Sequence, residues 1–481
     1  MTARPIRLLA ALAAAFLLGA CTVGPDYKRP PAPIPASYKE AEGWKVAEPK
    51  EAGLGGPWWA PYNDPVLDGL LQQIQVSNQT LKAQEAAYRQ SIAVLRQARS
   101  GLFPVVTVNP SAQRSQTAGG TSREPVVQNR YDVSTLASWD LDLWGRVRRS
   151  IESNEASVQA SAADLAAVRL SLQAALATDY YELRVADQLK RLLDATVADF
   201  TRSLQITRNQ HNAGVAALSD VITAQTQLDT ARAQAINVGV QRAQLEHAIA
   251  ALIGKPPADF SIAPAPLTRE VPVIPTGVPS TLLERRPDIA AAERQMAAAN
   301  AQIGVAVAAY YPDITLSGSF GYAAAMGPLF AASNQLWSFG ATIAETIFDG
   351  GLRDAQVEAA RAVYDQTVAN YRQSVLTAFQ QVEDQLAALR ILEQQAAVVD
   401  AAVRDAREAV RLTLNEYQAG TVAYTTVITA QTTALSNEQN ALTVHQNRLV
   451  ASIALTQALG GGWSAEQLSG GPQKAPKDKS S

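Results

Sequence analysis

The only cysteine in the chain, Cys21, is the residue best placed by its neighbours to undergo a chemical modification. It follows the small-residue end of an apolar run, Leu18–Ala20, and Arg4 and Arg7 precede that run. This pattern predicts a cleaved secretory signal over residues 1–20 and a lipobox, in which the thiol receives a diacylglycerol and the new amino terminus an acyl chain. Several acyl chains together are what stable membrane anchoring requires. An ordinary signal peptide with an incidental cysteine remains the alternative.

No other group of residues in the sequence has the spacing of a catalytic or metal site. A single thiol excludes an intrachain disulfide and a thiolate cluster, and His211, His247 and His445 are isolated from one another and are predicted to lie on helix surfaces. The sequence has no phosphate-binding loop, nucleophile elbow or zinc-binding helix motif. A net charge of −3 disfavours nucleic acid as a partner. We therefore expect no enzyme, no metal, and no cofactor beyond the lipid on Cys21.

The prolines are distributed very unevenly, and their absence marks two long segments. Residues 126–255 and 329–471 contain none of the 25 prolines. Because proline disrupts a helix interior, these segments are predicted to be largely helical. The chain is 47% hydrophobic but only 6% aromatic, so its apolar side chains are mostly small and aliphatic, as in closely packed helices.

The body of the chain contains one unit that occurs twice. The hexapeptide Val221–Thr226 recurs unchanged as Val427–Thr432. Three glycines recur with the same spacing, Gly145, Gly214 and Gly254 as Gly351, Gly420 and Gly460. We interpret this as a tandem duplication. The predicted segments are a lipid-anchored extended tether at 21–65, a first repeat at 66–255, a Pro-rich linker at 256–280, a second repeat at 281–462 and a polar tail at 463–481.

Each repeat is predicted to contain a long helix followed by a shorter antiparallel one. The segments between Gly145 and Gly214 and between Gly351 and Gly420 lack both glycine and proline. Their apolar residues recur at steps of three and four in a narrow seam, which is typical of coiled-coil packing. We predict long helices at 146–213 and 352–419, tight turns at the glycines, and return helices at 215–253 and 421–459, with a further helix before each strand pair.

Alternating sequence before each long helix predicts pairs of strands. The strand pairs span 103–144 (Phe103–Thr117 with Arg130–Trp144) and 314–348 (Ile314–Ala325 with Ser338–Phe348). Each strand is long enough to cross a bilayer when tilted, and one apolar and one polar face are typical of the wall of a water-filled barrel. A soluble hairpin half-buried on a core is the alternative.

Four strands are too few to close a barrel, which needs about eight or more. Open sheet edges cannot face lipid. If this sheet enters a membrane, several chains must therefore share one barrel. Two chains would supply eight strands and three would supply twelve, and the sequence leaves both open.

Three motifs resemble the outer-membrane efflux protein family: Leu283–Ile289 with Arg-Arg-Pro-Asp at its centre, Ala309–Pro312, and Phe348–Gly351. The lipobox and Pro-rich N-terminus resemble the lipid-anchored, OprM-like branch of these TolC-like factors, and the likeness extends from about Tyr27 to Gly462. It implies an α+β membrane protein, a homotrimer whose 12-stranded transmembrane β-barrel takes four strands per chain and continues into a long antiparallel α-helical coiled-coil barrel.

The resemblance also implies a function and a location. Such a protein is the outer-membrane channel of a tripartite efflux pump, a passive exit duct for drugs and other toxic small molecules. It would be anchored in and span outer-membrane lipid, with a helical tunnel in the periplasm. Its expected partners are a periplasmic adaptor protein and an inner-membrane RND-type pump. A type I protein-secretion channel, or a lipid-anchored coiled-coil structural lipoprotein, are the alternatives.

The family places the two helix–helix turns at the periplasmic tip, where the adaptor docks. The matching residues are Ala213, Gly214 and Val215 in the first repeat and Ala419, Gly420 and Thr421 in the second. Some relatives close the tip with a lock of Asp, Tyr and Arg. Asp220 and Tyr417 match two members, but Val422 stands where a charged residue is expected. We therefore expect closure to depend on packing and hydrogen bonds around Tyr417, with Asp220 contributing. The alternative is that Asp220 merely begins or caps the return helix.

The basic run Arg146–Arg149 comes directly after the second predicted strand. We predict that it forms a solvated collar where the strands meet the helices. A role in pore selectivity is the alternative.

Overall fold

The computed structural model describes residues 22–40, 57–117, 125–267, 270–272, 274, 282–325 and 327–469. The predictions for the signal segment 1–20, for lipidation of Cys21 and for parts of the tether, linker and tail lie outside these residues.

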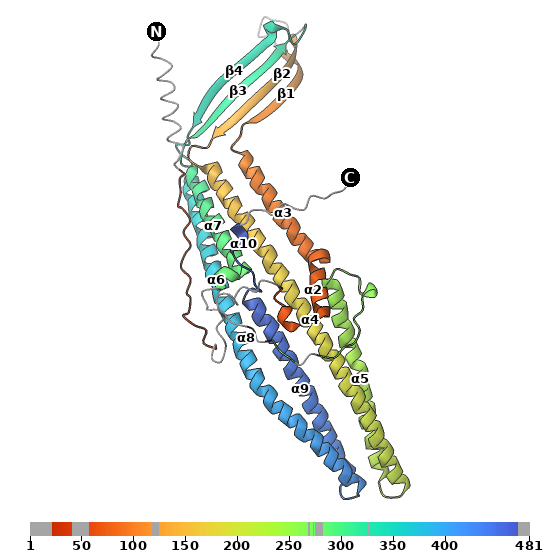
Figure 1. The fold of residues 1–481 in the computed structure, drawn as a ribbon. Helices are drawn as coiled ribbons and strands as arrows, with labels where there is room; N and C mark the ends of the chain where they lie inside the picture. Colours follow the sequence, from red (N-terminus) through yellow and green to blue (C-terminus); the bar gives the residue numbers. More distant parts are fainter. Residues whose placement is uncertain are drawn as a thin grey trace. The chain divides into compact units, whose positions relative to one another are not determined.

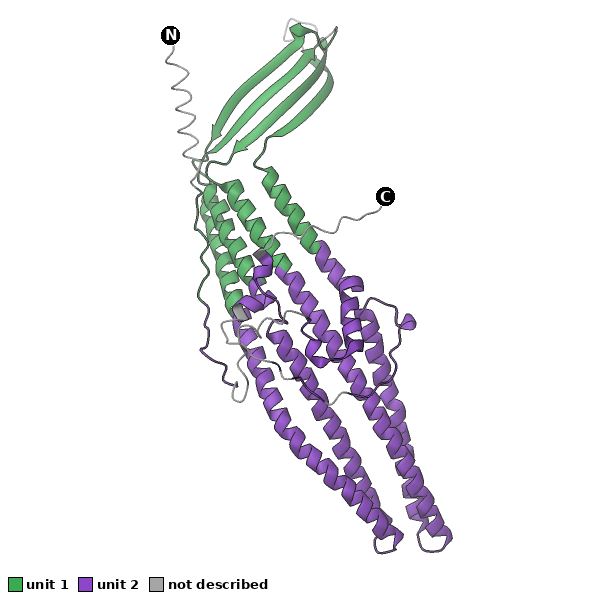
Figure 2. Ribbon diagram, viewed as in Figure 1, with its two compact units in different colours: residues 1–31, 87–162, 291–372 green, residues 32–86, 163–290, 373–481 purple. Residues whose placement is uncertain are grey.

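The chain forms two compact units, which Figure 2 distinguishes by colour. Unit 1 comprises residues 1–31, 87–162 and 291–372, and unit 2 comprises residues 32–86, 163–290 and 373–481. Unit 1 contains the whole sheet with the adjoining ends of four helices. Unit 2 contains the remaining parts of the two long helices together with both return helices (Figure 2).

Two helix–turn–helix pairs account for most of the helical residues (Figure 1). In the first, α4 (Arg146–Asn212) is followed by α5 (Leu218–Leu252), and in the second, α8 (Leu352–Gln418) is followed by α9 (Tyr424–Ala458). The long helices both have 67 residues and the return helices both have 35. At 1.5 Å per residue, each long helix is about 100 Å long.

The return helices begin three residues later than the sequence predicts, at Leu218 and Tyr424 instead of 215 and 421. Gly214 and Gly420 both have a φ of 76°, which glycine adopts without strain. The next amide reaches back across each turn, from Val215 to the Gln210 carbonyl and from Thr421 to the Glu416 carbonyl, at 2.9 and 3.0 Å. This pattern ends a helix and directs the chain away from it, so a short connection must precede the return helix.

The single helix predicted before each strand pair is divided in two. In the first repeat α2 (Pro65–Ser77) and α3 (Gln79–Ser100) are separated at Asn78, whose side chain accepts a hydrogen bond from the Leu81 amide. In the second, α6 (Leu282–Arg285) ends just before the proline that begins α7 (Pro287–Ala308). Both breaks have local causes, because an asparagine cap and a proline at the first helical position each start a new helix.

One antiparallel sheet contains all four strands in sequence order (Figure 1). The strands are β1 (Val105–Thr117), β2 (Val126–Leu141), β3 (Asp313–Ala324) and β4 (Gln335–Ala344). Strand β2 pairs with β3, so the strand pairs of the two repeats are joined side by side.

Strands β2 and β4 end at Leu141 and Ala344, earlier than the predicted limits of 144 and 348, and an aspartate beyond each strand caps the following long helix. The Asp142 carboxylate accepts the Val147 and Arg148 amides at 2.8 and 2.9 Å. The Asp349 carboxylate accepts the Gly351 amide at 3.0 Å. Each cap satisfies backbone donors that have no partner inside the helix.

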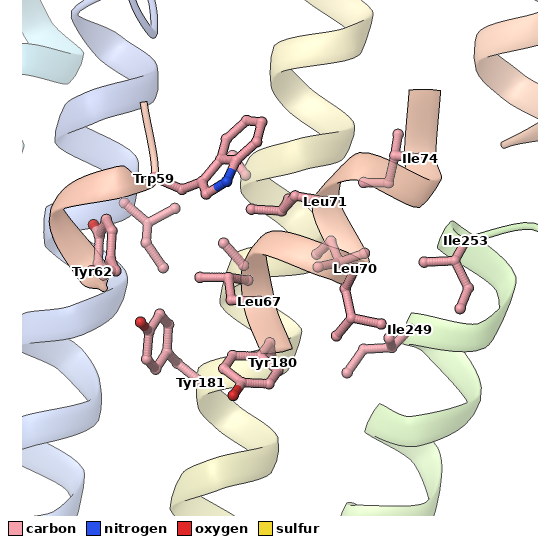
Figure 3. Packing of buried hydrophobic residues seen from close by; sticks show 14 of the residues in the cluster. Trp59, Tyr62, Leu67, Leu70, Leu71, Ile74, Tyr180, Tyr181, Ile249 and Ile253 are labelled. Atoms are coloured by element: carbon pink, nitrogen blue, oxygen red, sulfur yellow. The ribbon is translucent and has the colours of Figure 1, made fainter. Parts of the chain in front are cut away.

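The predicted extended tether at 21–65 is wrong for its last residues, which fold into the core of unit 2. Residues Ala60–Tyr62 form a short 3-10 helix, η1, and Trp58, Trp59 and Tyr62 are buried. Figure 3 shows Trp59 and Tyr62 among Leu67, Leu71, Tyr180 and Tyr181. Burying a large aromatic side chain contributes about 1.5–3 kcal/mol, which favours docking over an extended chain.

Three further short helices complete the described fold. These are η2 (Pro257–Asp259) in the linker, η4 (Ala332–Asn334) between the last two strands, and α10 (Glu466–Ser469) in the tail.

Candidate functional site

The pairing register divides the sheet into an apolar and a polar face, because directly opposed residues project to the same side. Phe320, for example, lies between Thr135 and Trp337, and Gly318 lies between Ala137 and Phe339. The apolar face includes Val106, Val108, Trp139, Leu316, Phe320, Trp337, Phe339 and Ile343. The polar face includes Thr107, Asn109, Asp132, Ser134, Ser138, Thr315, Ser317, Ser319 and Ser338. Apolar residues on this face include Val105, Leu136 and Leu336.

The apolar face is exposed in the single chain. Trp337 and Phe339 retain 75% and 77% of their accessible surface, and Val108 retains 63%. An uncovered apolar patch of this kind indicates contact with a partner or a membrane. The alternative of a soluble hairpin half-buried on a core therefore does not describe this sheet. The polar face has its own contacts, since the Thr315 hydroxyl donates to Asp140 at 2.7 Å.

The two outer strands leave unpaired backbone along both edges of the sheet. Strand β1 pairs only with β2, and β4 only with β3, within the described residues. These edges are 13 and 10 residues long. Unpaired N–H and C=O groups of an edge strand are free to bond to another strand.

The basic run at the β2–α4 junction is only in part the predicted solvated collar. Arg146 is half exposed and lies 3.9 Å from Asp313. Arg148 bonds to the capping carboxylate of Asp142 at 3.1 Å. Arg149, in contrast, has a side chain that is only 4% exposed. The three arginines therefore have three different environments.

Tyr417 of the predicted gate lies buried inside the chain, with 5% of its surface exposed. Its hydroxyl donates to the Thr207 hydroxyl of α4 at 3.5 Å, and its ring centroid is 5.2 Å from that of Tyr424. The Gln210 side chain donates to the Tyr417 carbonyl at 3.3 Å. Tyr417 therefore connects the end of α8 with the end of α4.

Asp220 lies near this cluster, and its negative charge contributes to raised pKa values of both tyrosines. Burial is the larger cause, and it raises the pKa of Tyr424 to about 12. Both phenols therefore stay protonated at physiological pH and can donate hydrogen bonds. No hydrogen bond joins Asp220 to Tyr417 among the described residues. Asp220 is in the first turn of α5, where its charge is favourable, so it lies at the start of the return helix as the alternative has it, although the N-cap residue itself is Ala217.

The sequence did not reveal a second polar contact between the hairpins. The Gln431 side chain of α9 donates to the Ser203 hydroxyl of α4 at 3.0 Å, and both residues are buried. Gln431 belongs to the repeated hexapeptide, but its counterpart Gln225 accepts from Arg208 at the surface. Identical sequence therefore has different environments in the two repeats. The sequence feature that could have indicated this contact is the pair Ser203 and Thr207, two hydroxyl side chains one helical turn apart within an apolar stripe.

The predicted docking residues are exposed at both turns. Ala213, Gly214 and Val215 lie at the first turn and Ala419, Gly420 and Thr421 at the second. The return helices begin in different environments beyond these turns. Leu218 and Ile222 are each 59% exposed at the start of α5, whereas Tyr424 and Val427 are buried at the start of α9.

No set of three or more His, Cys, Asp or Glu side chains in the described ranges is arranged to hold a metal ion. None of the described helices combines the length and apolar character needed to span a membrane.

Comparison with known proteins gives consistent matches over nearly the whole chain. A family model described as outer membrane efflux protein matches residues 70–255 and again 278–461. The toluene efflux pump outer membrane protein TtgC of Pseudomonas putida is 31% identical over 465 residues, which cover 95% of this chain and 96% of that protein. The outer membrane protein OprJ of Pseudomonas aeruginosa is 32% identical over 469 residues, or 96% and 97% of the two chains.

Solved structures give the same result. The outer-membrane channel OprN superposes with a TM-score of 0.87 at 30% identity, covering 92% of this chain and 100% of that one. The open state of the Neisseria gonorrhoeae MtrE outer membrane channel superposes with a TM-score of 0.81 at 27% identity, covering 92% and 99%.

The two copies of the hexapeptide allow a matched test of the buried contact. We expect Gln431→Ala to lower the free energy of unfolding by about 1–3 kcal/mol, because it leaves the buried Ser203 hydroxyl without this partner. Gln225→Ala, at the surface, should change it by less than about 0.5 kcal/mol. Thermal melting of the purified variants, followed by far-UV circular dichroism, gives the comparison. Equal melting temperatures for the two variants would contradict the assignment.

Proposed function

This chain belongs to the outer membrane efflux protein family, which makes it the outer-membrane component of an efflux pump, and we propose that three copies form the exit duct. In this proposal drugs and other toxic small molecules pass from a periplasmic adaptor protein and an inner-membrane RND-type pump to the exterior. The duct is passive and performs no chemistry.

The sheet with one exposed apolar face and two unpaired edges is the observation that carries this proposal. In hydrocarbon each unpaired backbone group costs several kcal/mol, so the edges must be joined to other strands. Because all pairs in the sheet are antiparallel, β1 of one copy and β4 of the next have the directions needed for a further antiparallel pair. Closure would put the apolar face toward lipid and the polar face toward water.

The number of copies follows from the required lumen. A barrel of about eight strands has an interior that side chains fill, and larger barrels leave an aqueous channel. Two copies would supply eight strands and three would supply twelve. A duct for drug-sized molecules therefore favours the homotrimer with a 12-stranded transmembrane barrel. In the same assembly the paired long helices of the tandem repeats would form the periplasmic coiled-coil tunnel.

We also propose a lipid anchor for each copy. Cys21, with a diacylglycerol on its thiol and an acyl chain on its amine, would attach the N-terminus to the outer membrane. The lipobox of the sequence supports this. Mass spectrometry of the N-terminal peptide identifies the modification directly.

The hairpin ends are the proposed meeting point with the adaptor. The exposed turns at 213–215 and 419–421 have small side chains, which would allow close approach of a partner helix. We propose that the same region closes the resting duct through Tyr417, with Asp220 contributing its charge and Val422 contributing packing in place of a charged lock residue. The buried contact of Tyr417 with Thr207 supports this, because opening would separate the ends of α4 and α8.

Susceptibility measurements test the efflux function. Deletion of the gene, together with a record of the neighbouring pump genes, should lower the inhibitory concentrations of several unrelated toxic compounds at least fourfold. Complementation with the intact gene should restore them. Unchanged susceptibility in a strain whose other efflux channels are also deleted would oppose the drug-efflux assignment, and accumulation of a secreted protein in the cell would favour the type I secretion alternative.

Two neighbouring residues of β4 test the orientation of the sheet. Phe339→Arg puts a charge on the apolar face, where lipid contact would cost about 2–4 kcal/mol, and we expect less trimer in the outer membrane. Ser338→Arg puts the same charge on the polar face, so trimer should form and the conductance of the open channel should change. Native gels of outer-membrane extracts and planar-bilayer recordings measure both. The opposite order of effects would show that the assigned faces are reversed.

Variants at Tyr417 test the proposed gate. We expect Tyr417→Ala to increase the resting conductance of the reconstituted channel several-fold, because it removes the packing and hydrogen bond that hold α8 to α4. Tyr417→Phe keeps the ring and should have a smaller effect, and Asp220→Asn should have a smaller one still. Tyr417→Ala channels as resistive as wild type would remove Tyr417 from the gate.

A further inference from the structure

The N-terminal segment of the described chain is docked onto unit 1. The Val23 amide donates to the Trp144 carbonyl at 3.1 Å, at the junction of β2 and α4. The Asn300 side chain of α7 donates to the Pro25 carbonyl at 2.9 Å, and the Tyr27 hydroxyl donates to Glu293 of the same helix. Residues 23–27 therefore use backbone and side-chain contacts to α7 and to the β2–α4 junction, although they form no helix or strand of their own.

Arg149 makes most of its contacts with this segment. Its guanidinium donates to the carbonyls of Val23 and Gly24 at 3.1 and 3.2 Å and to the Asp26 carboxylate at 2.9 Å. The fourth partner is Glu152, one turn further along α4, at 2.8 Å. A guanidinium that is almost fully buried needs all its donors satisfied, and three of its four partners are supplied by residues 23–26.

Two glycines make this arrangement sterically specific. The Arg149 stem lies against Gly304 of α7, where an added Cβ would be 2.8 Å from the arginine Cγ. Gly24 has a φ of 93°, and a Cβ there would be 2.4 Å from the Gly304 Cα. Side chains at these two positions would push the segment away from the helices, so the sequence is suited to close approach.

We propose that Arg149 is a positioning residue that clamps residues 23–26 to unit 1 and thereby fixes Thr22 beside Gly145, at the end of the strands. Thr22 is in direct contact there, because a Cβ on Gly145 would be 2.7 Å from the Thr22 methyl group. Arg149, the last residue of the basic run, therefore contacts the chain itself instead of facing a pore.

The consequence for the membrane rests on the proposed function. If the strands span the outer membrane and Cys21 is acylated, a clamp next to residue 22 brings the acyl chains to the membrane surface at the foot of the strands. The anchor and the strands then enter the same leaflet, and the clamp prevents the anchor from reaching along the helices.

Limited trypsin digestion tests the clamp, because Lys28 directly follows the docked residues 23–27 and is exposed. A protease must lift several residues out of their contacts to cleave there. For the full-length protein purified in detergent, we expect cleavage after Lys28 to be about tenfold faster in Arg149→Ala than in wild type. Arg149→Lys keeps the charge but loses the forked geometry, so its rate should lie between the two. Arg146→Ala, the half-exposed neighbour, should cleave at the wild-type rate.

Cleavage of Arg149→Ala at the wild-type rate, with helix content unchanged by circular dichroism, would overturn the proposal. If Arg149→Ala does not fold, Asp26→Asn and Gly24→Ala disturb the same contacts from the segment side, and wild-type cleavage in both would overturn it equally. The digestion does not depend on acylation, trimer formation or conductance. Failure of the clamp is therefore distinguishable from failure of the duct, which the native gels and bilayer recordings measure.

Discussion

The hydrogen-bonding needs of the backbone in hydrocarbon are the constraint on which this structure depends. A single chain offers four strands with two unpaired edges and an exposed apolar face, so it is incomplete as a membrane structure and also unfavourable in water. The proposed association with further copies would resolve both problems at once, since it would pair the edges and let lipid cover the apolar side. In that proposal the four strands of one chain are one part of a closed barrel.

The junctions between strands and long helices show how one polypeptide connects two such different architectures. Strand β2 ends at Leu141 and β4 at Ala344, and an aspartate a short distance beyond each strand caps the next helix. Arg148 and Arg353 neutralise the capping carboxylates, and both are close to the first turn of their helix. The same kind of cap therefore stabilises the start of the long helix at both junctions.

Sequence periodicity predicted the regular elements well, because their causes are local. The absence of proline and glycine between Gly145 and Gly214 predicts α4, and strict alternation around Trp139 predicts β2. The place of Trp58 and Tyr62 in the core of unit 2 could not be predicted, since a Pro-rich segment gives no periodic signal and the receiving surface around Tyr180 and Tyr181 is formed by residues far away in the sequence. Tyr417 was identified through resemblance, but its burial against Thr207 depends on how α4 and α8 pack, which no local pattern specifies.

The unequal ends of the two hairpins have an evolutionary consequence. Two copies produced by a duplication begin with the same sequence and the same packing. In this chain, however, Tyr424 and Val427 are buried whereas Leu218 and Ile222 are exposed. Substitution at an enclosed position must preserve volume, whereas a solvent-facing position tolerates many side chains. Within the single chain, the start of α5 is therefore expected to accept a wider range of substitutions than the start of α9.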